Sequence, residues 1–240
     1  MFTKPSNTQK SKVDASTLSI NKADLNVQKM EIFGRSLNNL KLIAEPANTG
    51  LKMIIDSTEI NGEAEWQKEG NGKIIARLKN LTIPNDDNLT NKPVEKKEIK
   101  KLANGYPALD VLVENFQLGN KKLGSLELNA YENGDNWDIQ KLVITNPDSS
   151  LTAEGSWHNW TRSPNTNLKF TLSITNIGNT LKRFGQPDAV KGGEANISGQ
   201  FKWAGSPHEF DTNSLNGNFE FEAKKGQFLK VQPGFGRLFG

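Results

Sequence analysis

The stretch Asn167–Ile174, NLKFTLSI, alternates polar and apolar side chains with a strict period of two. Successive side chains of a β-strand point to opposite faces of the sheet, so this stretch predicts a strand with one apolar face and one solvated face. The same alternation recurs along most of the chain, and we therefore expect an all-β protein. The apolar side of such a sheet must be covered by a second sheet, a helix or a ligand.

Outward from this stretch, the pattern predicts about twelve strands separated by short turns. Five lie in the first half of the chain: Ala23–Phe33, Asn38–Glu45, Leu51–Ser57, Thr58–Gln67 and Lys73–Ile83. Seven lie in the second half: Ala108–Leu118, Leu123–Tyr131, Trp137–Asn146, Leu151–Trp157, Leu168–Thr175, Ala195–Trp203 and Leu215–Lys224. Parallel pairing needs a long crossover between strands, so these short turns favour a long antiparallel meander.

One or two short helices interrupt the strand pattern. Thr180–Phe184 follows Asn179, which can act as an N-cap, and is the best helix candidate. Val231–Phe239 is a second candidate for a helix or turn. The chain otherwise divides into a loose polar lead-in (1–17), a first β-meander segment (18–83), a long polar loop (84–105) and a more regular β segment (106–240).

The width of the sheet restricts its shape. Twelve strands at ~4.8 Å spacing span roughly 55–60 Å, and open sheets of that size curl or split into two layers. Hydrophobic residues make up 35% of the chain, less than is usual for a globular domain. This low content favours a curled sheet over a dense sandwich, although periodicity alone leaves both open.

Composition argues against several classes of function. The net charge is +3, from 30 basic and 27 acidic residues that are interspersed, so no nucleic-acid surface is expected. The basic run Lys96–Lys101 lies in a polar stretch and is interpreted as solvated. There is no cysteine, and no segment approaches the ~20 apolar residues that cross a bilayer. The amino terminus lacks the apolar core of a signal peptide.

No motif typical of an enzyme is present, and we expect neither catalysis nor a cofactor. His158 lies between Trp157 and Trp160, where aromatic rings could stack on a sugar, but a core tryptophan beside exposed loop residues explains the pattern better. His208 has no obvious partner, and two histidines without cysteine make a zinc site improbable. Asn85–Asn88 lacks the spacing of a calcium loop and is interpreted as a solvated turn.

The last third of the chain carries motifs in a recognisable order. These are Gly192–Ala195, Gly199–Pro207, Leu215–Phe219 and Gly226–Leu238, with Tyr106–Val111 and Leu142–Asp148 before them. Together they resemble the carboxy-terminal region of the AsmA-like superfamily, in its YhdP branch. The similarity is specific from about residue 104 to 240, whereas residues 18–83 match only in pattern and turn placement.

The resemblance implies a part of an envelope protein of diderm bacteria. Such proteins are anchored in the inner membrane by an amino-terminal helix and extend through the periplasm as a long, curled β-sheet. The open, taco-like groove of that sheet carries phospholipid toward the outer membrane and so supports the permeability barrier. The anchor is absent here, and relatives continue beyond Leu238–Gly240, so we interpret the chain as an internal or truncated fragment. Protein partners cannot be inferred.

Within this interpretation, phospholipid acyl chains would contact the apolar phase of the strands. The candidate lining residues are Leu109, Val111, Val113, Leu126, Leu128, Ile139, Leu168, Phe170, Leu172, Ile174, Ile197, Phe201, Phe219 and Phe221. The alternative is that these side chains fill the core of a closed sandwich or barrel. That would make the chain a binding or adhesion module, or a structural spacer. Leu181 and Phe184 of the predicted helix are equally compatible with a plug and with a gate.

Overall fold

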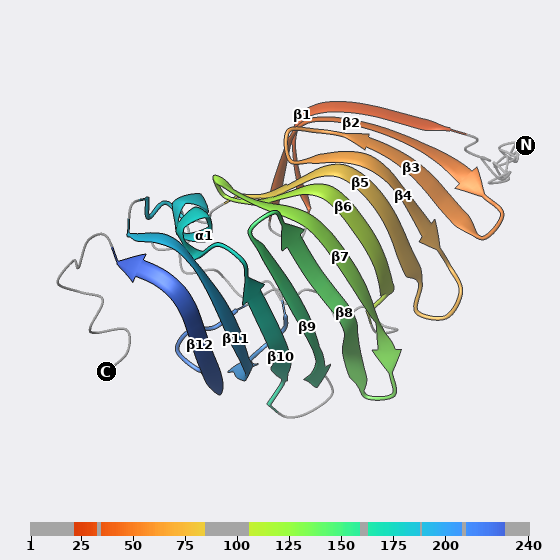
Figure 1. The fold of residues 1–240 in the computed structure, drawn as a ribbon. Helices are drawn as coiled ribbons and strands as arrows, with labels where there is room; N and C mark the ends of the chain where they lie inside the picture. Colours follow the sequence, from red (N-terminus) through yellow and green to blue (C-terminus); the bar gives the residue numbers. More distant parts are fainter. Residues whose placement is uncertain are drawn as a thin grey trace, which may run out of the picture.

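The computed structural model describes residues 22–32, 35–84, 106–158, 163–187, 189–207 and 210–228. These residues form one sheet whose strands follow each other in sequence order, with a single short helix (Figure 1). Its first seven strands are β1 (Ala23–Ile32), β2 (Arg35–Ala47), β3 (Gly50–Asp56), β4 (Ile60–Gln67), β5 (Lys73–Ile83), β6 (Ala108–Leu118) and β7 (Lys121–Asn133). The remaining elements are β8 (Asn136–Asn146), β9 (Ser149–His158), β10 (Asn165–Ile174), α1 (Ile177–Arg183), β11 (Val190–Ala204) and β12 (Asn216–Phe228).

The all-β prediction is confirmed, and so is the open form of the sheet. All twelve strands belong to one sheet, in which β1 and β12 are the two edges. Figure 1 shows this sheet curling from β1 to β12 without closing into a barrel. The described residues therefore contain neither a closed barrel nor a second sheet that would complete a sandwich.

The antiparallel prediction is wrong at one junction. Ten neighbouring pairs of strands are antiparallel, but β5 and β6 pair in parallel, from Lys73 opposite Ala108 to Ile83 opposite Leu118. A parallel connection must return along a whole strand, which for β5 is roughly 36 Å. The segment between Ile83 and Ala108 is long enough to do so, and it is the segment that we had predicted to be only a polar loop.

The helix is longer than predicted and begins earlier. It spans Ile177–Arg183, and its N-cap is Asn176, whose side chain accepts a hydrogen bond from the Asn179 backbone N–H at 2.9 Å. The prediction of Asn179 as the N-cap was therefore wrong. The predicted helix began three residues too late, at Thr180 and not at Ile177. The predicted lead-in (1–17), most of the predicted loop (85–105) and the second helix (Val231–Phe239) lie outside the described residues.

The two faces of the sheet differ in burial. Paired residues on adjacent strands point to the same side, so the register assigns each side chain to a face. Both faces carry leucines. Leu126 of β7 is 8% exposed on one face, whereas Leu112 of the adjacent strand β6 is 40% exposed on the other. We call the side that carries Leu126 the apolar face and the side that carries Leu112 the polar face. The apolar face is therefore the more deeply buried of the two.

The best-packed part of the apolar face lies at the parallel junction. Its buried cluster comprises Ala76, Leu78, Val113, Phe116 and Leu126. Strands β5 and β6 each carry one extra residue here. Successive side chains on the apolar face are therefore three residues apart, Leu78 and Leu81 in β5 and Val113 and Phe116 in β6. Such bulges bend a strand while keeping both flanking side chains on one face. The side-chain amide of Asn115 joins the two bulges by donating to the Lys79 carbonyl at 3.0 Å.

Candidate functional site

The candidate site is the apolar face itself, on which side chains line up in rows across the strands. One row, which we call the Val113 row, crosses all twelve strands without a polar side chain. Its members are Leu25, Leu42, Ile55, Gly62, Leu78, Val113, Leu126, Ile144, Leu151, Leu172, Ile197 and Phe221. At ~4.8 Å between strands, the row forms a continuous apolar strip about 50 Å long.

The register brings all the predicted lining residues to this face. Val113, Leu126, Leu172, Ile197 and Phe221 belong to the Val113 row, with Ile174 one step beyond Leu172. Val111, Leu128, Phe170 and Phe219 lie in the adjacent row, and Leu109, Ile139, Leu168 and Phe201 in the row after that. Their placement on one face is a structural fact, whereas their contact with lipid stays a prediction.

The sequence prediction missed that the same face continues through the first five strands. Alternation also places apolar side chains of β3 and β5 on it, namely Leu51, Met53, Ile55, Ile74, Ala76 and Leu78. The signal was present in the sequence, because these residues recur at every second position. The prediction did not extend to them because the motifs that carry the family resemblance begin only at Tyr106.

Tryptophans gather on the apolar face at one end of strands β7–β12, and we call this end of the strands the Trp lip. Trp137, Trp157 and Trp203 lie on the apolar face at the ends of β8, β9 and β11. The Trp137 indole N–H donates to the Pro107 carbonyl at 3.0 Å, and Trp157 packs edge-to-face on Tyr106 at 4.4 Å. Tyr106 and Pro107, which directly precede β6, therefore contact the apolar face at this lip.

Helix α1 occupies the opposite end of the strands. Asp148, in the turn between β8 and β9, accepts hydrogen bonds from Asn179 at 2.8 Å and from the Arg183 guanidinium at 2.7 Å. These hydrogen bonds, and then the charge of Arg183, hold the pKa of the Asp148 carboxyl below its usual value. Arg183 also donates to the Lys122 carbonyl at 3.3 Å, so the helix is tied to two turns of the sheet. Phe184 is exposed, and whether α1 plugs or gates the groove stays a prediction.

Aromatic rings dominate the apolar face at its carboxy-terminal edge. Phe170 and Phe201 stack with ring centroids 5.0 Å apart. Phe219 lies so close to Gly199 that a Cβ at that glycine would come within 2.8 Å of it. Phe219 and Phe221 remain about half exposed, because β12 has no neighbouring strand on its outer side among the described residues.

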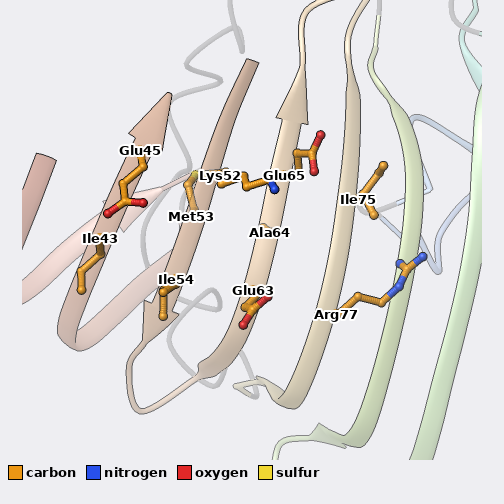
Figure 2. Close-up of a pocket in the computed structure, with 10 residues that line it drawn as sticks. All are labelled: Ile43, Glu45, Lys52, Met53, Ile54, Glu63, Ala64, Glu65, Ile75 and Arg77. Atoms are coloured by element: carbon orange, nitrogen blue, oxygen red, sulfur yellow. The ribbon is translucent and has the colours of Figure 1, made fainter. Parts of the chain in front are cut away.

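The polar face carries a hollow of about 310 Å³ across β2–β5. Figure 2 shows its lining: charged side chains, among them Glu45, Lys52 and Glu65, alternate with the apolar side chains of Ile43 and Ile54. Arg77, at one border, is already paired with Asp110 at 2.9 Å. Opposite charges on neighbouring strands stabilise a solvated sheet face.

The described residues offer no metal centre, since they contain no group of three or more His, Asp or Glu side chains positioned to hold an ion. His158 is engaged by Asn136, at 2.6 Å from its Nδ1, and Trp157 is buried beside it. A sugar-stacking pair is thus not assembled by the described part of the chain. Trp160, His208, Asn85–Asn88 and Lys96–Lys101 lie outside the described residues.

Comparison with known proteins decides the family. The family model described as YhdP protein matches residues 2–240, which is nearly the whole chain. The chain belongs to the YhdP family. A curated YhdP relative, the intermembrane phospholipid transporter YhdP of Escherichia coli (strain K12), is 23% identical over 203 residues. That match covers 82% of the chain but only 16% of the relative, so the chain spans a small part of that YhdP protein.

No solved structure matches the chain significantly. Among the described residues, the helix is too short and too polar to cross a bilayer. The description of the fold of this YhdP segment therefore rests on the single open sheet seen here, without a solved structure for comparison.

Proposed function

We propose that this chain is a segment of a lipid conduit, in which the acyl chains of phospholipids move along the apolar face. The observation that carries the proposal is the Val113 row, which is apolar on every strand and lies in a sheet that does not close. Moving one methylene from water to an apolar wall is worth ~0.8 kcal/mol, so ~12 kcal/mol for a sixteen-carbon chain. A continuous strip without polar interruptions lets a chain slide without losing that energy at any step.

The finer proposal concerns the place of this segment in the cell. Membership of the YhdP family and the name of the Escherichia coli relative support the periplasmic part of an inner-membrane-anchored protein. In that setting the conduit carries phospholipid between the inner and outer membranes and maintains the outer-membrane permeability barrier. The segment acts by binding and guiding lipid, and no catalytic step is required.

Photo-crosslinking from two neighbouring residues tests the conduit. Leu172 points to the apolar face and Thr171, the preceding residue of β10, points to the polar face. We expect a photoreactive amino acid at position 172 of the purified chain to capture phospholipid, and the same group at position 171 to give only background. Absence of lipid at position 172, or equal capture at both positions, would leave an ordinary structural or binding module as the better account.

A charge in the groove tests transport in cells. Phe170→Glu places a carboxylate on the apolar face, whereas Lys169→Glu changes the charge on the polar face of the same strand. We expect only the first variant, introduced into the gene that encodes this chain, to weaken the outer-membrane barrier against a hydrophobic dye. Because a desolvated carboxylate also destabilises packing, protease resistance must be compared. A normal barrier with Phe170→Glu would contradict transport along this face.

A further inference from the structure

The two ends of strands β7–β12 differ in structure, and this difference matters for the headgroup of a lipid whose acyl chains lie on the apolar face. Helix α1 runs along the strand ends opposite the Trp lip, from the start of β11 to the turn before β7 (Figure 1). Gly178 lies close to Val190 and Gly192 at one end of the helix, and Arg183 reaches Lys122 at the other. We call this edge, formed by α1 and the adjoining strand ends of β7–β12, the α1 lip.

Positive charge gathers at the α1 lip. Among the described residues, seven cations lie there: Lys121, Lys122, Lys182, Arg183, Lys191, Lys224 and Lys225. Three of them are neutralised, because Arg183 pairs with Asp148, Lys224 with Glu222 and Lys225 with Glu194. The other four lysines have no ion-pair partner among the described residues. They come from the start of β7, from the last turn of α1 and from the start of β11.

The described residues of the Trp lip carry the opposite charge. Its described turns contain Glu132, Asp135 and Asp211, and no lysine or arginine in residues 131–136, 157–158, 163–165, 203–207 and 210–215. The strands between the lips carry the apolar face, so an amphiphile lying across β7–β12 meets a cationic edge on one side and an anionic edge on the other. An anionic headgroup is attracted to the first and repelled by the second.

We propose that the α1 lip binds the phosphate of phospholipids whose acyl chains lie on the apolar face of β7–β12, through Lys121, Lys122, Lys182 and Lys191. This inference rests on the proposed function and adds the side of the groove on which headgroups travel. Lysine suits the task because its ammonium is a compact point charge on a flexible stem, which engages a phosphate without fixing its orientation. Exposed pairs of this kind are individually weak, so a lipid is oriented without being trapped.

Two sets of substitutions with equal charge change test the assignment. The lip variant carries Lys121→Gln, Lys122→Gln, Lys182→Gln and Lys191→Gln. The matched control carries Lys52→Gln, Lys79→Gln, Lys169→Gln and Lys202→Gln, four exposed lysines of the polar face without an ion pair in the described structure. The probes are phosphatidylglycerol and a diacylglycerol with the same acyl chains, each in detergent and measured by co-elution with the full 240-residue chain.

We expect the wild-type chain and the control variant to prefer phosphatidylglycerol, with a preference that weakens as salt is added. The lip variant should lose about tenfold of this preference while binding diacylglycerol as before. An unchanged preference, or an equal loss of both lipids, overturns the assignment. Equal binding of both lipids by the wild-type chain also overturns it but leaves the conduit intact, whereas binding of neither lipid contradicts the conduit itself.

A last measurement separates a lipid headgroup from a free anion. Inorganic phosphate alone is titrated into the wild-type chain and followed by phosphorus NMR. We expect no binding at millimolar concentration, because the acyl chains supply most of the affinity. Saturable binding that the lip variant loses, together with displacement of phosphatidylglycerol by the same phosphate, would identify a free-anion site and overturn the proposal.

Discussion

The middle and the end of the Val113 row differ sharply in burial although their chemistry is the same. Val113 and Leu126 are 3% and 8% exposed, whereas Phe221, at the β12 end of the row, is 49% exposed. All three are apolar and point to the same face. The difference comes from what surrounds them. In the middle, paired strands and bulges lie on both sides, whereas β12 has a paired strand on only one side among the described residues. Alternation therefore determines which face a side chain is on but not how deeply it is buried.

The largest effect is expected in the middle of the row. Leu126→Ala removes a buried side chain from the cluster that contains Leu78, Val113 and Phe116. The lost apolar contacts and the cavity left behind should lower the free energy of unfolding by about 2–4 kcal/mol. Urea denaturation followed by tryptophan fluorescence measures this change. A loss as small as that of an edge residue would mean that the cluster at the parallel junction is not a stabilising core.

A smaller and local effect is expected where α1 meets the sheet. Asp148→Asn replaces the carboxylate that accepts hydrogen bonds from Asn179 and Arg183 with a neutral amide. This should lower the free energy of local unfolding of α1 by about 1–2 kcal/mol. Amide hydrogen exchange should then speed up in residues 177–183 while β5–β7 keep their protection. Equal loss of protection in both regions would contradict the view that the helix stabilises only the β7–β11 end.

The same contact makes a prediction about pH. The pKa of Asp148 is lowered in the folded chain, so its contribution to stability is fully present above its ordinary value of 3.8. That contribution is lost as the pH falls through the lower, folded value. Protection of α1, corrected for intrinsic exchange, should hold from neutral pH to about pH 4 and decline below it. In Asp148→Asn this decline should be absent.

The smallest effect on stability is expected at the β12 edge. Phe221→Ala should lower the free energy of unfolding by about 1 kcal/mol, because about half of the side chain is exposed already and only the buried half loses apolar contacts. Under the proposed function it should nevertheless reduce capture of phospholipid from position 172, since Phe221 continues the same row. A destabilisation as large as that of Leu126→Ala would show that another part of the chain covers the edge in solution.

Much of the fold followed from the sequence, and the errors have physical causes. Alternation located all twelve strands to within a few residues and placed the fourteen predicted lining residues on one face. It failed between Ile83 and Ala108. A polar segment does not reveal whether the next strand starts at the same end of the sheet, as in an antiparallel pair, or at the opposite end, as in the parallel pair β5–β6. It also misplaced the helix cap, since Asn176 and Asn179 are equally good capping residues when only the sequence is considered.

The sequence by itself determined an all-β chain with one apolar face, because the period of two is a local property of each strand. Only the tertiary structure decided the order and direction of the strands, the edge position of β12 among the described strands and the depth of burial along the Val113 row. It alone brought Lys122 to the same lip as Lys182 and Lys191, since Lys122 begins β7 and is far in sequence from α1 and the start of β11. Contacts between distant segments depend on the path of the chain, and local alternation does not encode that path.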